Sequence, residues 1–233
     1  MKTIGLIGGM SWESTVPYYQ IINTRVKEKL GGLHSAKCVL YSVDFQEIET
    51  CQASGQWEKS GRILAGAAQA LQAAGADFLV ICTNTMHKVA RQVEEAVSIP
   101  LVHIARVTAE ALKARQVRRV ALLGTRYTME QDFYKAILVE EGIQVMIPEE
   151  DDRAEINRVI FEELCLGEIL PQSKAKFLSV VEALARQGAE GVILGCTEIG
   201  LLIQQEDTPV PLFDTTRLHA LAAADLALAD AGI

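Results

Sequence analysis

Two stretches of the sequence, about 110 residues apart, repeat one succession of patterns. Each has a Gly-Ala helix end, an apolar strand-like run and a polar turn leading into a helix, at residues 75–90 (GADFLVICTNTMHKVA) and 188–203 (GAEGVILGCTEIGLLI). A second pair, IGLIGGMSW at 4–12 and VALLGTRYT at 120–128, shares a strand followed by a glycine turn. The repetition predicts an internal duplication, and therefore two similar folding units in one chain.

Strand-like runs alternate with longer helical patterns along the chain, which is typical of parallel sheets built from βαβ units. Ser11 is the expected N-cap of the first helix, and Gly31-Gly32 its stop. We expect strands at 2–8, 38–45, 78–82, 101–104 and from 118, and helices at 11–32, 58–76, 86–97, 108–115 and 215–231.

The predicted fold class is α/β, with two similar doubly wound parallel-sheet lobes. The first lobe comprises residues 1–104 together with 214–233, because the last helix is expected to return to it, and the second lobe comprises 105–213. Ligands of open parallel sheets bind beyond the carboxyl ends of the strands. We therefore expect the active site in the cleft between the lobes.

Composition narrows the classes of partner. The 233 residues are 49% hydrophobic and carry a formal net charge of −8 without a Lys/Arg cluster, which argues against nucleic acid and anionic membrane surfaces. No apolar run reaches the ~20 residues of a membrane span, and the N-terminus lacks a signal-peptide pattern. Five cysteines without C-x-x-C spacing favour neither disulfides nor a zinc site. We expect a cytoplasmic protein with a small-molecule partner.

Polar turns follow the predicted strands at Gly8-Gly9, Thr83-Asn84-Thr85, Gly124-Thr125 and Gly195-Cys196-Thr197. Asn84 and Thr85 can either cap a helix or bind a substrate carboxylate. Cys196 follows a strand at the expected N-terminus of a helix, where the local positive potential lowers a thiol pKa and favours the thiolate. Strand alternation directs either Cys82 or Thr83 towards the ligand, and aligning the repeats puts Thr83 opposite Cys196.

Four motifs resemble the aspartate/glutamate racemase superfamily, in particular its aspartate-racemase branch: IGLIGGMSWEST, CTNTMH, ALLGTRYTM and GCTEIG. The resemblance covers nearly the whole chain. It implies a homodimeric amino-acid racemase that works without pyridoxal phosphate or metal, in which two facing cysteines remove and return the α-proton. Cys196 matches the second cysteine. The residues expected to bind or enclose the substrate are Met10, Gln52, Asn84, Thr85, Thr125, Thr197 and Glu198.

The sequence departs from this family pattern in two ways. Thr83 stands where the family commonly has its first cysteine, and a hydroxyl is too weak an acid to be ionised near neutral pH. We therefore expect the Cys196 thiolate to act mainly on the L-enantiomer, with Thr83 relaying a proton from water or stabilising the carbanion. The Arg and Lys that hold the distal carboxylate in aspartate racemases are also missing, with Leu166 before Gly167 and Gln52 as the best neutral substitute. This favours broad amino-acid specificity.

Two further functions remain open at this point. One is a non-catalytic protein that binds a carboxylate or an amino acid, and the other is a single-cysteine isomerase or lyase acting on a dicarboxylic acid. His87 either supports a neighbouring group or transfers a proton itself. The GLIGGM turn lacks the G-x-G-x-x-G spacing of a dinucleotide site.

Overall fold

The computed structural model describes residues 1–229, and the chain divides into two compact units. The first unit comprises Met1–His103 and the C-terminal segment from His219, and the second comprises Ile104–Leu218. The sequence predicted the second lobe at 105–213. Residues 230–233 of the predicted first lobe, including the end of the predicted last helix, lie outside the described residues.

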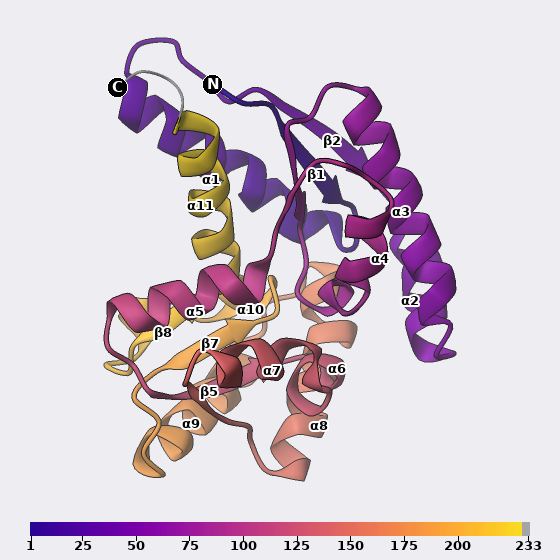
Figure 1. Ribbon diagram of the computed structural model, residues 1–233. Helices are drawn as coiled ribbons and strands as arrows, with labels where there is room; N and C mark the ends of the chain where they lie inside the picture. Colours follow the sequence, from indigo (N-terminus) through magenta and orange to yellow (C-terminus); the bar gives the residue numbers. More distant parts are fainter. Residues whose placement is uncertain (230–233) are drawn as a thin grey trace. The chain divides into compact units, whose positions relative to one another are not determined.

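The first unit contains a four-stranded parallel sheet in the order β2-β1-β3-β4 (Figure 1). Alternate residues of β3 enter hydrophobic clusters on opposite faces, as expected of a strand buried on both sides. The strands are β1 (Ile4–Gly8), β2 (Cys38–Ser42), β3 (Phe78–Ile81) and β4 (Leu101–Val102). The helices are α1 (Trp12–Leu30), α2 (Phe45–Ala53), α3 (Trp57–Ala73), the 3-10 helix η1 (Thr85–Val89), α4 (Ala90–Glu95) and most of α11 (Thr215–Leu228).

The second unit contains a parallel sheet in the order β6-β5-β7-β8. This is the same order as in the first sheet, since β5 to β8 take the places of β1 to β4. The repeated order confirms the predicted pair of similar doubly wound lobes. The strands are β5 (Arg119–Gly124), β6 (Gln144–Met146), β7 (Val192–Gly195) and β8 (Leu212–Asp214). The helices are α5 (Ile104–Ala114), α6 (Arg126–Glu130), α7 (Asp132–Glu140), α8 (Glu150–Glu162), η2 (Leu164–Leu166), α9 (Pro171–Arg186), α10 (Ile199–Leu202) and η3 (Gln205–Asp207).

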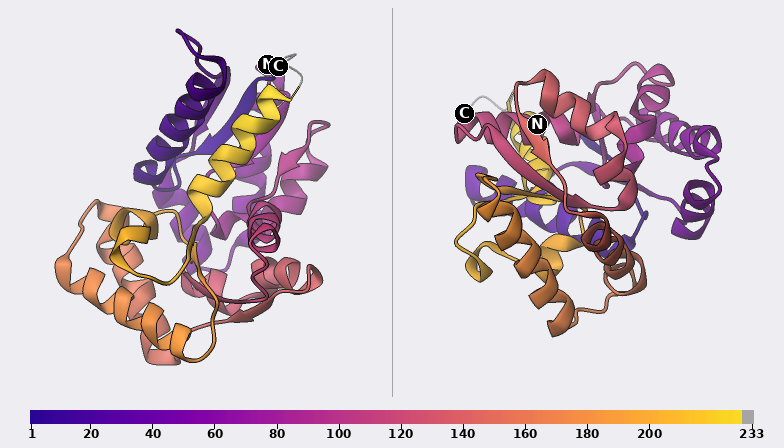
Figure 2. Two further views of the ribbon diagram at one scale, coloured as in Figure 1. Left: turned by 90° about the vertical axis from the view of Figure 1, so that its left-hand side faces the viewer. Right: turned by 90° about the horizontal axis from the view of Figure 1, so that it is seen from below.

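The C-terminal helix α11 lies alongside α1 (Figures 1 and 2). Arg25 of α1 reaches across to Asp225 of α11 with two hydrogen bonds of 2.8 and 3.0 Å. Small side chains allow two helices to approach closely, which suits an alanine-rich helix to this position. Four alanines of α11 share a buried cluster with Tyr18 of α1, namely Ala220, Ala223, Ala224 and Ala227.

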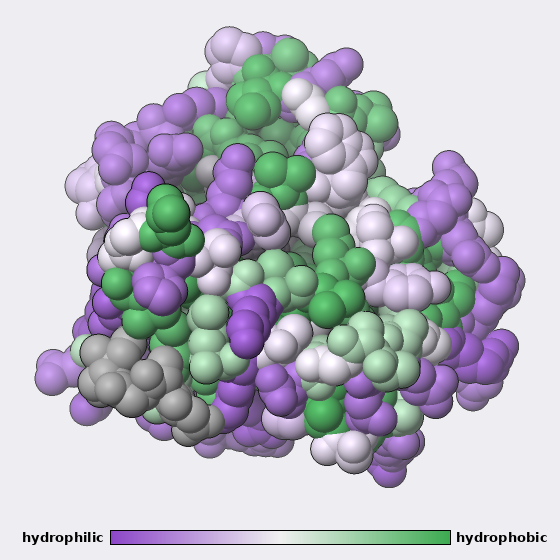
Figure 3. Space-filling model, turned by 90° about the horizontal axis from the view of Figure 1, so that it is seen from above, coloured by the Kyte–Doolittle hydropathy of each residue, from purple (hydrophilic) through white to green (hydrophobic). Residues whose placement is uncertain are grey.

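The face of the protein drawn in Figure 3, which is the top of the view in Figure 1, carries both hydrophilic and hydrophobic residues. Hydrophilic residues dominate the rim of this view, and hydrophobic residues are exposed among them (Figure 3). Within residues 1–229, no helix is both long and apolar enough to cross a membrane.

Helix α2 lies in a segment to which the sequence analysis assigned no helix. The predicted strand at 38–45 ends at Ser42 because Asp44 is the N-cap of α2. The Asp44 carboxylate accepts a hydrogen bond from the Gln46 N–H at 3.1 Å, which satisfies one of the free donors of the first helical turn. The capping signal thus overrides the apolar residues that extended the predicted strand.

Ser11 precedes α1 as predicted, but its side chain does not cap the helix. Its hydroxyl donates to Glu13 Oε2 at 3.2 Å, and its φ of 67° is rare for a residue other than glycine. The hydroxyls of Ser14 and Thr15 both donate to the Ser11 carbonyl, at 3.0 and 3.3 Å. These bonds hold the unusual turn, but they satisfy none of the free N–H groups that a cap would satisfy.

Candidate active site

The turn after β3 contains the predicted group Thr83-Asn84-Thr85. Cys82 is buried in the core, where burial raises the pKa of its thiol, so strand alternation turns Thr83 away from that core. Thr83 is half-buried, whereas Asn84 and Thr85 are buried. Asn84 occupies the N-cap position of η1, but its side chain does not cap that helix. The capping alternative for Asn84 is therefore wrong.

The turn after β1 lies beside the Thr83 turn, because Ile7 of β1 pairs with Ile81 of β3. Gly9 has a φ of +86°, and a Cβ at this position would collide with the carbonyl oxygen of Val43, so glycine is required. Its N–H donates to Thr15 Oγ1 at 3.0 Å. Met10, which was predicted to enclose the substrate, is buried in one of the hydrophobic clusters of the first unit.

Gln52, the predicted neutral contact for a substrate side chain, is a buried residue of α2. Its Nε2 donates to the Met86 sulfur at 3.1 Å. A thioether is a weak, uncharged acceptor. A carboxylate or amide oxygen would be a stronger partner for the same N–H group.

In the second unit, the turn after β7 joins three polar side chains through one carboxylate oxygen. The Cys196 thiol donates to Glu198 Oε2 at 2.9 Å, and the Thr197 hydroxyl donates to the same oxygen at 2.8 Å. All three residues are buried. The structure thus bonds Glu198 directly to the predicted catalytic thiol and Thr197 to Glu198, both of which were predicted to bind substrate.

The surroundings of Cys196 shift its pKa in the direction opposite to the one expected from the sequence. Burial raises the pKa of Cys196 well above its ordinary value, and the negative charge of Glu198 raises it further. The expected helix dipole is weak here because α10 has only four residues. The thiol proton nevertheless points at a carboxylate that can accept it.

The turn after β5 lies beside the Cys196 turn. Gly124 pairs with Gly195 across β5 and β7, and a Cβ on Gly124 would lie 2.8 Å from the Gly195 carbonyl oxygen, so the strands approach too closely for a side chain. Thr125 is the N-cap of α6, and its Oγ1 accepts a hydrogen bond from the Thr128 N–H at 3.3 Å. The second unit thus brings Thr125 and Cys196 to the same edge of one sheet.

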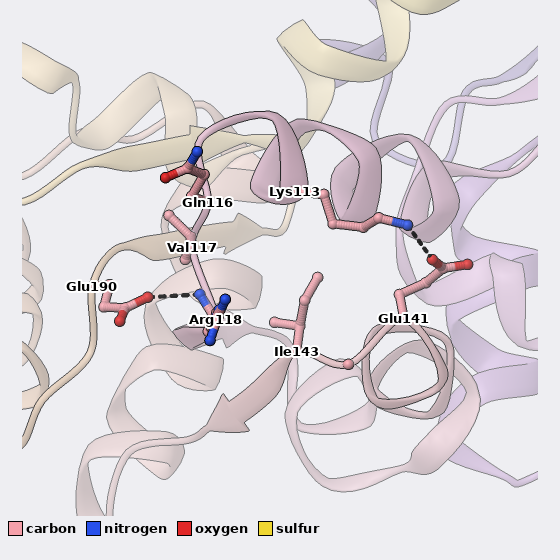
Figure 4. A pocket seen from close by; sticks show the side chains of 8 residues that line it. Lys113, Gln116, Val117, Arg118, Glu141, Ile143 and Glu190 are labelled. Atoms are coloured by element: carbon pink, nitrogen blue, oxygen red, sulfur yellow. Dashed lines mark hydrogen bonds and ion pairs between the residues drawn. The ribbon is translucent and has the colours of Figure 1, made fainter.

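A large open pocket lies at the other end of the second unit's sheet (Figure 4). It has a volume of about 800 Å³ and is bordered by residues that precede β5, β6 and β7 at their amino ends. Lys113 forms a 2.7 Å ion pair with Glu141, and the Glu190 carboxylate accepts a 2.6 Å hydrogen bond from the Arg118 backbone N–H. Ligand sites of parallel sheets lie at the carboxyl ends, so this pocket is not a candidate active site.

Two features of the site escaped the sequence analysis. The Cys196–Glu198 pair has a possible sequence signal, since the two residues are separated by one position in a turn. The second feature is a group of three histidines around His87, whose members share no sequence spacing. In the described part of the chain, no set of three or more His, Cys, Asp or Glu residues is arranged to hold a metal ion.

A sequence model of the Asp/Glu/Hydantoin racemase family matches residues 7–223. The chain belongs to this family. A Yersinia pestis protein assigned to the Asp/Glu racemases is 55% identical, with coverage of 98% of this chain and 100% of the other and a TM-score of 0.91. For an aspartate racemase homologue from Pyrococcus horikoshii, the identity is 39%, the coverage 97% and 99%, and the TM-score 0.84. The broad specificity amino-acid racemase of Bacillus subtilis is 21% identical over 97% of this chain and 98% of its own length.

Proposed function

We propose that the protein is an amino-acid racemase that needs neither pyridoxal phosphate nor metal. Cys196 removes the α-proton, and Thr83 serves the return of a proton to the opposite face of the substrate. The observation that carries this proposal is the buried hydrogen bond from the Cys196 thiol to Glu198 Oε2 at 2.9 Å. A thiol aimed at a carboxylate is the arrangement that an activated sulfur base requires.

The reaction begins with transfer of the thiol proton from Cys196 to Glu198, which leaves a thiolate and a neutral carboxylic acid. The thiolate then takes the α-proton, and the substrate becomes a carbanion. Thr83 donates its hydroxyl proton to the opposite face and is reprotonated by water. The hydroxide left by that water is neutralised by the proton held on Glu198, so the enzyme returns to its starting state.

Hydrogen-bond donors stabilise the negative charge that spreads from the α-carbon onto the substrate carboxylate. We assign this role to Asn84, Thr85, Thr125 and Thr197, which follow β3, β5 and β7 at their carboxyl ends. Glu198 binds no substrate in this scheme and acts on Cys196. Met10 and Gln52 complete the set as groups near the substrate side chain.

The substrate class follows from the relatives and from Gln52. Relatives are named for aspartate and glutamate, and one for broad specificity. A neutral Gln52 can bind a carboxylate, an amide or a hydroxyl through its N–H group, whereas a cation would select carboxylates. We therefore propose aspartate, glutamate or a wider set of amino acids as substrates.

We expect L-aspartate, L-glutamate or another L-amino acid to exchange its α-proton for deuterium when incubated with the protein in D2O. NMR measures the exchange, and chiral chromatography of the same samples measures inversion. D-enantiomers of the panel are tested in parallel. A binding protein would leave every α-proton in place, and a dicarboxylate lyase or isomerase would change the carbon skeleton or functional group, so either result rejects the proposal.

We also propose that the protein forms a homodimer. Trp12, Val16 and Tyr19 are exposed at helical spacing on one face of α1, and such an apolar face favours association with a second copy. Light scattering coupled to size-exclusion chromatography should give the mass of two chains. Tyr19→Lys should shift the distribution towards one chain, because a charge would be buried in the interface. The mass of a single chain for the parent protein would contradict the proposal.

A further inference from the structure

Three imidazole rings of the first unit meet behind the Thr83 turn. His87 belongs to η1, His103 follows β4 directly, and His219 belongs to α11. The ring centroids of His87 and His103 are 4.6 Å apart, and those of His87 and His219 are 5.7 Å apart. His87 is thus the central member, in contact with both of the others.

Hydrogen bonds to main-chain carbonyls define which nitrogen carries the proton in His87 and in His219. His219 Nε2 lies 2.7 Å from the carbonyl oxygen of Val102, so this nitrogen carries the proton, and Nδ1 accepts from the Tyr18 hydroxyl at 2.9 Å. His87 Nδ1 lies 2.8 Å from the Thr83 carbonyl oxygen, and must therefore donate to it. His87 and His219 both make these bonds as neutral rings.

Burial lowers the pKa of two of the three histidines. It lowers the pKa of His87 well below its ordinary value, with the neighbouring His103 and His219 adding to the shift. Burial likewise lowers the pKa of His219 to about 4. Burial thus disfavours the charged form of both His87 and His219.

The two outer histidines mark the places where the chain passes between the units. The first unit ends at His103, and the chain returns to it at His219. Both of these residues pack on His87, and His87 holds the carbonyl of the turn residue Thr83. A connection built from side chains therefore runs from both crossings to the Thr83 turn.

We propose that His87 is a positioning residue for Thr83, which it fixes by donating a hydrogen bond to the Thr83 carbonyl and by packing on His103 and His219. In this role His87 orients Thr83 and is not itself the proton donor to the substrate. The role rests on the proposed racemase function. This positioning role predicts that loss of the Nδ1–H donor slows the return of a proton by Thr83 and leaves the removal of the α-proton by Cys196 unchanged.

Two substitutions separate the donor from the ring. His87→Phe keeps a ring against His103 and His219 but has no donor, whereas His87→Asn keeps an N–H group close to the position of Nδ1. We expect His87→Phe to lower the rate of inversion of the L-substrate by about tenfold. Its α-deuterium exchange without inversion, which involves Cys196 and Glu198 but not Thr83, should stay within about twofold of the parent. His87→Asn should recover most of the inversion rate, and the exposed His34→Phe should change neither rate.

A double-mutant cycle tests whether His87 acts through Thr83. In a Thr83→Ala background, His87→Phe should reduce the residual inversion by no more than about twofold, because the group it positions is already gone. Equal losses in both backgrounds would overturn the proposal, as would His87→Asn behaving like His87→Phe. If His87→Phe fails to fold, as judged by its circular dichroism, His87→Leu, which also lacks the donor, takes its place in the same cycle and is judged by the same criterion. Absence of any exchange by the parent protein would instead reject the racemase function, and the role of His87 with it.

Discussion

Cys196→Ala is expected to reduce α-proton exchange by about 10³-fold or more and to leave the protein folded. The thiolate of Cys196 is the proposed base that removes the α-proton of the L-enantiomer, and alanine has no group that can replace it. Cys196→Ser should be equally inactive, because a hydroxyl does not ionise near neutral pH. Deuterium incorporation from D2O into the L-substrate, followed by NMR, measures the effect. Circular dichroism and the thermal unfolding midpoint establish that the fold is retained.

Cys82→Ala is the matched control for this experiment. Cys82 is buried in the core at the end of β3, so its truncation should cost stability without touching the exchange rate. The opposite pattern, an inactive Cys82→Ala and a fully active Cys196→Ala, would mean that the two sequence repeats were aligned incorrectly.

Glu198→Gln tests the role of Glu198 as the acceptor of the Cys196 thiol proton. Glutamine can still accept a hydrogen bond from the thiol but cannot take up its proton, so we expect exchange to fall by about 10²-fold. Because the Cys196 thiol has a raised pKa, little thiolate forms without an acceptor. Normal exchange by Glu198→Gln would remove Glu198 from the mechanism and leave Cys196 as an unassisted base.

Thr83→Cys is expected to raise the turnover number for the D-enantiomer relative to that for the L-enantiomer, by about 10- to 100-fold. Removal of a proton from the D-face requires a base at residue 83. A thiol has an ordinary pKa of about 8.5 and can be shifted towards neutrality, whereas a threonine hydroxyl cannot approach that range. The substitution thus supplies the missing second sulfur.

The comparison of the two enantiomers in Thr83→Cys and the parent must use turnover numbers. Enantiomers have equal free energies, so the Haldane relation makes kcat/KM equal in the two directions for the parent and for every variant. Any directional bias therefore lies in kcat and KM separately. Initial rates at saturating L- and D-substrate, measured by chiral chromatography, report the ratio. Thr24→Cys, which adds a thiol at an exposed position of α1, is the control, and an unchanged ratio in Thr83→Cys would exclude Thr83 from the proton-transfer position.

Much of the fold could be predicted because its signals are local. The apolar runs and the helical patterns indicated two parallel α/β lobes, and the sheets have the same strand order in both. Alternation along β3 separated Cys82, which faces the core, from Thr83. Helix α2 was missed because a single capping residue, Asp44, ends the strand signal, and short polar turns carry little periodicity.

By itself, the sequence determined which polar residues follow β1, β3, β5 and β7, because hydrophobic periodicity and glycine turns are properties of neighbouring residues. Only the tertiary structure decided the direction in which the pKa of Cys196 is shifted and the grouping of His87 with His103 and His219. A pKa depends on burial and on the orientation of nearby charges, and both arise when distant segments pack together. The histidines meet because β4 and α11 enter the first unit beside η1, an arrangement set by topology that no local pattern encodes.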